Sequence, residues 1–268
     1  NTIRFTIGAL NDYEQSESIS MDIMPELEKW VLHRLKELDI LLKKAVDSYT
    51  FQAFYSELNT FCSSDLSAFY FDIRKDSLYC DNANNEVRRS ARTVLYEVFK
   101  CLTAWLAPVI CYTAEEAWLA YNGNENEDSI HLKQFPEIPE NWINDELNDK
   151  WLRIRKIRKF INGGLELARQ EKIIGSSLEA KIVICMEDTQ YSTLLEAIDI
   201  EEISIVSKVE VIKGSILEGS YKEDGLEGLG VLVSPALGKK CVRCWKIDEK
   251  IDNNLEDPLC NRCIEVVK

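Results

Sequence analysis

The chain has 268 residues, of which 46% are hydrophobic and 29% are charged, and its formal net charge is −14. That length is typical of a protein with two domains and room for a small third. The apolar content is enough to bury a sizeable core. No apolar run approaches the roughly 18–20 residues of a membrane-spanning helix, so we expect no membrane partner. The excess of acid argues against non-specific nucleic-acid binding by the whole surface. The charge is uneven, however, because eight acidic residues and one lysine lie between Tyr121 and Asp149, which leaves room for basic patches elsewhere.

The first half of the chain has the spacing of helices. Apolar residues recurring every three to four positions predict helical segments at about 22–47, 51–62 and 85–106. A capping box of Thr113 and Glu116 predicts a short fourth helix. Together these segments predict an all-α bundle over residues 1–121.

The pattern changes after that bundle. Residues 122–145 are acidic and contain one glycine and two prolines, a composition that predicts a linker. A helix at about 147–170 then precedes three segments with strand-like patterns, LEAKIVIC, EEISIVSKVEVI and GLGVLVSPAL. We therefore expect a small α/β unit over 146–237. The predicted fold class is mainly α, with the helical bundle first, the α/β unit next and a short cysteine-rich tail over 238–268.

Four cysteines in that tail have the spacing of a metal site. Cys241, Cys244, Cys260 and Cys263 form the pattern Cys-x2-Cys-x15-Cys-x2-Cys, which is typical of a tetrahedral Zn²⁺ site. Four thiolates fill the coordination sphere, so the site is expected to be structural rather than catalytic. The alternative is a pair of disulfides or coincidental thiols. Trp245 directly follows the first pair. Its ring could either pack against the protein or stack on a base, and the sequence leaves both interpretations open.

The remaining cysteines indicate the setting of the protein. They stand singly among apolar residues, as small buried side chains with free thiols do: Cys62, Cys80, Cys101, Cys111 and Cys185. The odd total and the absence of a secretory signal favour a reducing, cytoplasmic setting. The sequence begins at Asn1 within an apolar pattern, so we expect it to be part of a longer chain.

Two predicted helices carry basic runs. In NNEVRRSARTVL, the arginines Arg88, Arg89 and Arg92 fall close together and opposite the apolar stripe at roughly 100° per residue. In KWLRIRKIRKFINGG, no acid interrupts Arg153, Arg155, Lys156, Arg158 and Lys159, and the apolar residues leave four of these five on the outer arc. Such strips can line up with phosphates, whereas the simpler explanation of either strip alone is a solvated helix face. Two strips on an acidic chain favour RNA contact.

Motifs of catalysis are missing from the sequence. The two histidines, His33 and His131, are far apart, and His33 in its helix is expected to be structural or solvent-facing. GLEGLG, from Gly225, has the wrong spacing for a dinucleotide fingerprint. No Ser/His/Asp or Cys/His arrangement stands out. We therefore predict no catalytic residues in this chain.

Several longer stretches resemble a known family. LSAFYFDIRKDSLY, RRSARTVLYEVFKCLTAWLAPVICYTAEEAW and KIIGSSLEAKIVI, followed by CVRCW…CNRC at the end, are similar to the C-terminal part of bacterial-type isoleucyl-tRNA synthetases. The helical stretches alone are shared with the valyl, leucyl and methionyl relatives. The complete ordered set, ending in the four cysteines, points to the isoleucyl family.

The resemblance implies a tRNA-binding role. In that family a helical anticodon-binding domain and an α/β junction with its zinc knuckle bind the anticodon. The ATP-dependent ligation belongs to a Rossmann domain with HIGH and KMSKS-type motifs, which lies upstream with an editing domain, and neither motif occurs here. The expected partners are an isoleucine-accepting tRNA and those upstream domains, in a monomeric parent. The four tail cysteines match the family's zinc ligands, and the expected tRNA-binding residues are Lys75, Arg88, Arg89, Arg92 (where the family often has glutamine), Arg153, Arg155, Arg158, Lys159, Arg169 and Trp245.

Two alternatives remain at this point. DNA glycosylases of the formamidopyrimidine type have a similar length and a four-cysteine finger, but they need an N-terminal Pro-Glu, and the pair Pro25-Glu26 is internal here. The other alternative is a zinc-stabilised interaction module that does not bind RNA. Its binding to a partner would be insensitive to salt.

Overall fold

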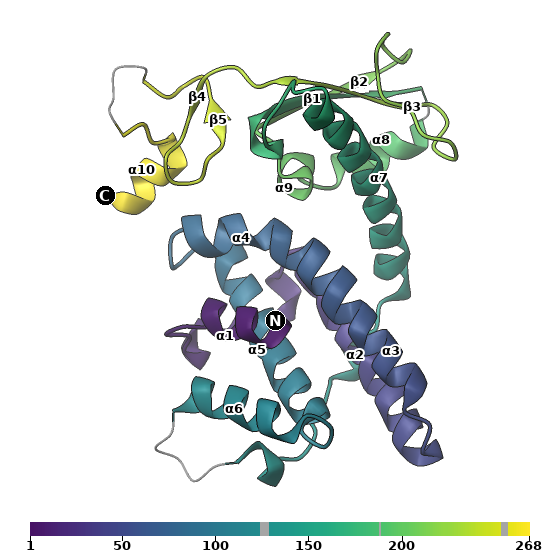
Figure 1. Cartoon of the computed structure of the whole chain (residues 1–268), viewed down its shortest axis with the longest axis vertical. Helices are drawn as coiled ribbons and strands as arrows, with labels where there is room; N and C mark the ends of the chain where they lie inside the picture. Colours follow the sequence, from purple (N-terminus) through teal and green to yellow (C-terminus); the bar gives the residue numbers. More distant parts are fainter. Residues whose placement is uncertain (124–128, 188, 253–256) are drawn as a thin grey trace. The chain divides into compact units, whose positions relative to one another are not determined.

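The computed structural model describes residues 1–123, 129–187, 189–252 and 257–268. The chain divides into two compact units, Asn1–Asn148 and Asp149–Lys268, which run from purple to teal and from green to yellow in Figure 1. The first unit is helical and the second combines helices with a small sheet, so the predicted mainly α fold class is confirmed. Of the helices in the described ranges, none is long and apolar enough to cross a membrane.

The first unit is built around helix α5 (Glu86–Leu106). Its elements are α1 (Thr2–Ala9), α2 (Glu26–Ser48), α3 (Gln52–Thr60), the π-helical segment η3 (Phe61–Tyr70), α4 (Phe71–Cys80), α5 (Glu86–Leu106) and α6 (Cys111–Asn122), with short 3₁₀ turns at Gln15–Glu17, Met21–Ile23, Ile130–Leu132 and Glu140–Trp142. Helix α5 packs against α1, α2, α4 and α6. It begins as predicted, because the Asn85 side chain accepts a hydrogen bond from the Arg88 amide at 3.1 Å and caps the first turn.

The start of α6 differs from the prediction. The helix begins at Cys111, and Ile110 occupies the cap position without a side-chain hydrogen bond. The chain turns at the end of α5, where the Ile110 amide donates to the Leu106 carbonyl, and enters α6 at once through the bond from the Ala114 amide to the Ile110 carbonyl. Thr113 therefore lies inside the first turn, and the predicted capping box with Glu116 is wrong.

The second unit consists of a three-stranded sheet covered by helices. Helix α7 (Asp145–Gln170) begins in the first unit and continues into the second. The sheet has the order β2-β1-β3, with β1 (Ala180–Met186) parallel to β2 (Lys208–Lys213) and antiparallel to β3 (Leu229–Pro235). Ile157, Phe160, Ile161 and Leu165 of α7 share a buried apolar cluster with the strand residues. The remaining elements are η6 (Ser177–Glu179), α8 (Thr189–Glu196), α9 (Ile200–Ser204), β4 (Lys239–Lys240), β5 (Ile247–Asp248) and α10 (Asn261–Val267).

One of the three predicted strands is shorter than its sequence pattern. The first part of EEISIVSKVEVI belongs to α9, because the Asp199 carboxylate accepts a hydrogen bond from the Glu202 amide at 3.0 Å and caps a helix there. Ile205 ends that helix in the left-handed region, at φ 55°. Strand β2 then starts at Lys208, so only the second half of the segment is a strand.

The described residues of 122–145, which we expected to be a linker, belong to the first unit, where Ile130–Leu132 contact α6 and Glu140–Trp142 contact α2. Lys36 is buried and donates to the Ile138 carbonyl at 3.0 Å and to the Glu140 carboxylate at 2.7 Å. Ile130 and Ile138, in the described part of this stretch, are buried. A domain boundary at 121, 145 or 237 stays a prediction.

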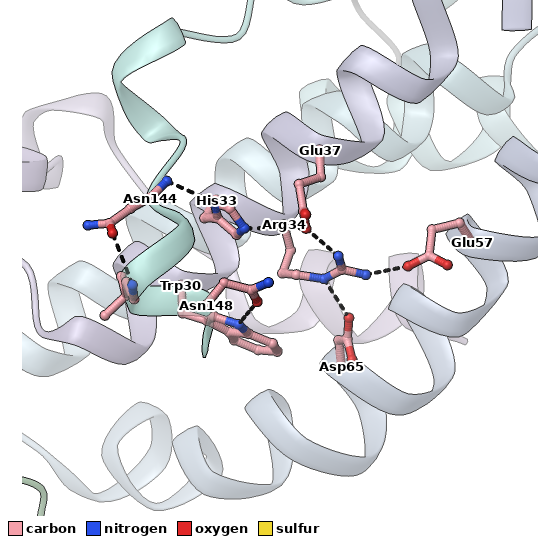
Figure 2. Close-up of polar contacts among 9 residues, drawn as sticks. Trp30, His33, Arg34, Glu37, Glu57, Asp65, Asn144 and Asn148 are labelled. Atoms are coloured by element: carbon pink, nitrogen blue, oxygen red, sulfur yellow. Dashed lines mark hydrogen bonds and ion pairs between the residues drawn. The ribbon is translucent and has the colours of Figure 1, made fainter. Parts of the chain in front are cut away.

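A row of polar side chains on α2 fixes the start of α7 (Figure 2). The buried His33 accepts a hydrogen bond from the Asn144 amide at its Nδ1, at 2.9 Å, which agrees with the structural role expected of it. Trp30 donates from its indole to the Asn148 side chain at 3.0 Å. Asn144 also caps α7 by accepting from the Leu147 amide at 3.0 Å. The spacing of three residues from Trp30 to His33 places both on one face of α2.

Arg34 extends from another side of α2 and joins it to the following helices. Its guanidinium donates to Asp65 at 3.0 Å and pairs with Glu37 and Glu57, as Figure 2 shows. Burial alone lowers the pKa of Arg34, but the carboxylates of Asp65 and Glu37 raise it above its usual value. The residue therefore stays charged and links α2 to α3 and η3.

A buried ion pair joins α2 to α4. Glu28 and Arg74 are almost completely buried, and the guanidinium binds the carboxylate through Nε at 2.6 Å and Nη2 at 2.8 Å. Tyr70 adds a hydrogen bond to Glu28 at 3.1 Å. Such a bidentate contact satisfies both charges in the protein interior.

The first prediction concerns this ion pair. We expect Arg74→Ala to lower the free energy of unfolding of the helical unit by about 3–5 kcal/mol, because Glu28 is left as a buried charge without its cation. Chemical unfolding followed by far-ultraviolet circular dichroism measures the change. Lys75→Ala, on the same helix but exposed, is the matched control and should shift the free energy by less than about 0.5 kcal/mol. Equal shifts for the two variants would contradict a special role of the pair.

Candidate metal centre and nucleic-acid interface

The four tail cysteines converge on one point. Their Sγ atoms all lie within 4.8 Å of one another, and all four side chains are buried. The Sγ atoms of Cys244 and Cys260 are 3.7 Å apart. A tetrahedral ion with metal–sulfur bonds of about 2.3 Å separates its ligands by about 3.8 Å. The four-cysteine group can therefore hold one metal ion.

Two short elements place these ligands. The first pair lies in the turn between β4 and β5, which is closed by the hydrogen bond from the Trp245 amide to the Cys241 carbonyl at 2.9 Å. Trp245 itself has a left-handed backbone, at φ 67°. Cys260 stands at the cap of α10 and Cys263 in its first turn. The Cys260 amide points at the Cys241 sulfur, 3.4 Å away, and so joins the two pairs.

The electrostatics of the group fit a cation. Burial raises the pKa of the Cys241 thiol, but the backbone amides of Cys244, Cys260 and Arg243 outweigh burial and lower it to about 6. Burial raises the pKa values of Cys244 and Cys260. Neighbouring thiolates oppose one another's ionisation unless a positive ion compensates them. All nine cysteines, each in a described part of the chain, are free thiols, so the disulfide alternative is not formed. With four sulfur ligands the centre has no open position for a substrate.

The ring of Trp245 faces solvent beside this centre. It is 60% exposed, and the ammonium of Lys240 lies 5.8 Å from its ring centroid. Most of the Trp245 side chain is therefore not packed against the protein. An exposed aromatic ring next to a cation is the arrangement on which an unpaired base can stack.

The arginines of α5 are mostly engaged with their own chain. Arg92 is buried and binds the Asn11 carbonyl at 2.8 Å and Glu17 at 3.2 Å. Arg89 donates to the Glu17 carbonyl at 3.1 Å, and Arg88 donates to a carbonyl of α4 at 3.2 Å. The segment after α1 thus covers the outer face of α5, so the expected outward-facing strip of three arginines is not formed, although Arg88 and Arg89 remain half-exposed.

The basic run of α7 divides between the two faces of the helix. Arg158 is buried and donates to the Ile203 carbonyl at 2.7 Å, and Arg155 is half-buried. Arg153, Lys156 and Lys159 are exposed, and none of the described residues forms an ion pair with them. Because they are three residues apart, they share one side of the helix. These three residues are called the α7 strip below.

The other candidates lie outside that strip. Lys75 of α4 is exposed and pairs with Asp72 at 3.5 Å. Arg169, in the last turn of α7, is exposed and pairs with Glu166. Lys156 belongs to the basic run but was not among the expected tRNA-binding residues. Its spacing from Lys159 is the feature of the sequence that points to it.

Comparison with known proteins identifies the family. The anticodon-binding domain of tRNA ligases matches residues 28–184. The isoleucine–tRNA ligase of Gluconobacter oxydans is 42% identical over 268 residues, which are 100% of this chain and 27% of that protein. Those of Mesorhizobium japonicum and Ruegeria pomeroyi are 40% identical over 249 residues (92% and 25%) and 42% identical over 264 residues (98% and 27%). The chain therefore spans about a quarter of the length of these curated relatives.

The second prediction tests the metal centre. We expect Cys260→Ser, or removal of the metal with a chelator, to unfold the tail, because metal binding and folding are coupled in so small a module. Limited proteolysis should then cut within 238–268, while circular dichroism still shows the helices of the first unit. Cys111→Ser, which changes an exposed cysteine outside the centre, is the control. An unchanged proteolysis pattern after chelation would exclude a structural metal.

Proposed function

The chain belongs to the family of anticodon-binding domains of tRNA ligases, and we propose that it is the tRNA-recognition arm of an isoleucine–tRNA ligase. The observation that carries this proposal is the family match over 28–184, which runs from α2 through α7 into β1. Full-length relatives named isoleucine–tRNA ligase match the whole chain. The complete ligase would attach isoleucine to its tRNA with ATP. That chemistry would belong to the part of the ligase that this sequence does not span.

The α7 strip and Trp245 supply the two kinds of contact that such an arm needs. Proteins usually read single-stranded loops by stacking unpaired bases on aromatic rings and holding the phosphates with cations. Arg153, Lys156 and Lys159 are exposed cations, and Trp245 is an exposed ring. We propose contacts to tRNA for these four residues and for Lys75, Arg88, Arg89, Arg155 and Arg169. The buried Arg92 and Arg158 would act on their own chain and position these surfaces.

The metal of the centre is proposed to be zinc. Four thiolates in a tetrahedral arrangement are the donor set that Zn²⁺ prefers in structural sites. The ion would hold the turn before β5 against α10 and so give the tail its shape. It would supply no catalysis, because all its ligand positions are protein sulfurs.

The same proposal covers the rest of the parent ligase. The parent would carry its catalytic domain, its editing domain and its ATP site elsewhere in the chain. It would be a monomer and would act in the cytoplasm. Free thiols at all nine cysteines are consistent with a reducing compartment.

The glycosylase alternative is not supported by the structure. Pro25 stands within the chain at the cap position of α2, where its nitrogen belongs to a peptide bond and cannot act as a nucleophilic amine. The alternative of an interaction module without RNA binding predicts a partner contact that salt does not weaken.

The third prediction tests anticodon recognition. The chain should bind an isoleucine-tRNA transcript more tightly than the same transcript with a replaced anticodon loop. The affinity should fall linearly on a double-logarithmic plot against salt, because binding releases counterions from phosphates. Equilibrium binding across a salt series measures both effects. Equal, weak binding to the two transcripts would contradict an anticodon-reading arm.

The fourth prediction concerns the α7 strip. We expect the triple variant Arg153→Ala, Lys156→Ala, Lys159→Ala to weaken tRNA binding at least about tenfold and to reduce the salt slope by about 2–3, since each lost phosphate contact removes about 0.7–0.9 from it. The control variant Lys208→Ala, Lys213→Ala, Lys222→Ala removes the same charge from exposed positions of the same unit. If both variants lose equal affinity, net charge rather than the strip decides binding.

A further inference from the structure

Residues 238–268, called the knuckle here, contribute none of their described residues to the buried apolar cluster that α7 forms with the sheet. The buried apolar cluster of the second unit extends from Ile157 to Val231, with Val233 partly buried against it, and it includes no described residue of the knuckle. The buried residues among those described in the knuckle are its four cysteines, Ile251 and Pro258. The metal ligands thus hold the knuckle together internally. They do not explain what fixes the orientation of the knuckle relative to the sheet.

The side chain of Ser207 answers that question. Ser207 lies between α9 and β2, at the edge of the sheet. Its hydroxyl accepts a hydrogen bond from the Ile247 amide of β5 at 2.7 Å and donates one to the Leu178 carbonyl, just before β1, at 2.5 Å. Its own amide donates to the Ala180 carbonyl at 3.1 Å. The half-buried Ser207 therefore binds the knuckle at Ile247 through its hydroxyl and the start of β1 at Leu178 and Ala180 through its hydroxyl and its amide.

The connection that leads into the knuckle restricts the same hairpin. The Ala236 amide donates to the Glu179 carbonyl at 2.8 Å, so the chain leaves the sheet beside its first strand. Gly238 follows with φ +116°, and a Cβ atom there would lie 2.4 Å from the backbone of Asp248. Asp248 is the neighbour of Ile247, so this close approach and the Ser207 bond act on one end of the β4–β5 hairpin.

We propose that Ser207 is a positioning residue for RNA recognition, which fixes the direction in which the knuckle presents Trp245 and Lys240. This inference rests on the proposed function of the chain as an anticodon-reading arm. Trp245 stands two residues before Ile247 on the same hairpin, so a rotation of the hairpin about the Ser207 bond moves the exposed ring directly. A ring held in place before binding loses less freedom when a base stacks on it.

Ser207→Ala tests the proposal in the full 268-residue chain. The variant removes both hydroxyl bonds but no charge and no metal ligand. We expect it to keep the metal content of the unaltered chain, to exchange the Ile247 amide hydrogen faster, and to bind the isoleucine-tRNA transcript about three- to tenfold more weakly, the range that the loss of a hydrogen bond of ordinary strength predicts. The preference for the intact anticodon loop should fall as well. A merely structural loss of folded protein would weaken binding to both transcripts equally.

Two further variants make the test specific. Ser207→Thr keeps a hydroxyl and should restore both the slow exchange at Ile247 and the transcript preference. Ser234→Ala changes a serine of β3 whose hydroxyl lies 3.5 Å from the Lys181 carbonyl, and it should behave as the unaltered chain.

The outcomes separate this inference from the proposed function. Faster exchange at Ile247 with an unchanged transcript preference would overturn the positioning role, as would unchanged exchange in Ser207→Ala. If the unaltered chain does not distinguish the two transcripts, the proposed function and the RNA role of Ser207 both fail. The exchange measurement would still decide whether Ser207 holds the knuckle.

Discussion

Pairing of buried charges is the constraint on which the rest of this structure depends. A charged side chain removed from water is costly unless an opposite charge and hydrogen bonds replace the water. Helix α2 carries three buried charged residues, Glu28, Lys36 and Asp39, and the half-buried Arg34. Glu28, Arg34 and Lys36 each have a partner on another segment of the first unit, and Asp39 pairs with Lys36 and Lys43 on α2 itself. The pairs therefore specify which helices lie against α2, in addition to the apolar packing. They also hold the stretch from which α7 starts.

The same constraint decides which cations remain for a partner. The chain has 32 lysines and arginines against 46 acidic residues, and several of its arginines are used inside the protein. Arg74 and Arg92 bind acids of their own unit, and Arg158 binds a carbonyl of α9. A polyanion can approach an acidic protein only where cations face solvent without neighbouring acids. The residues of the α7 strip face solvent without an ion pair to any described residue, so the proposed RNA contact would be local rather than a property of the whole surface.

Local patterns predicted the features that depend on local chemistry. The cysteine spacing indicated the metal centre because a two-residue gap lets one turn aim both thiols at a single ion. The start of α5 was predictable because Asn85 caps it through a hydrogen bond to a residue only three positions later. Features decided by distant segments could not be predicted in this way. Arg92 was expected to face outward, because nothing near it in sequence reveals that Asn11 and Glu17 cover that face of α5.

In the knuckle, one set of contacts determines the fold and another determines the orientation relative to the sheet. About 30 residues cannot bury enough apolar surface to fold alone or to bind firmly to a neighbouring sheet. The metal ligands provide the shape, since they join the turn at Cys241 to the helix at Cys263. They do not determine the direction of the knuckle, because no ligand comes from the sheet. A hydroxyl at the edge of the sheet supplies direction with one bond on each side, at Leu178 and at Ile247. Loss of the metal would then abolish the surface that carries Trp245, whereas loss of the hydroxyl would leave that surface intact but less firmly held to the sheet.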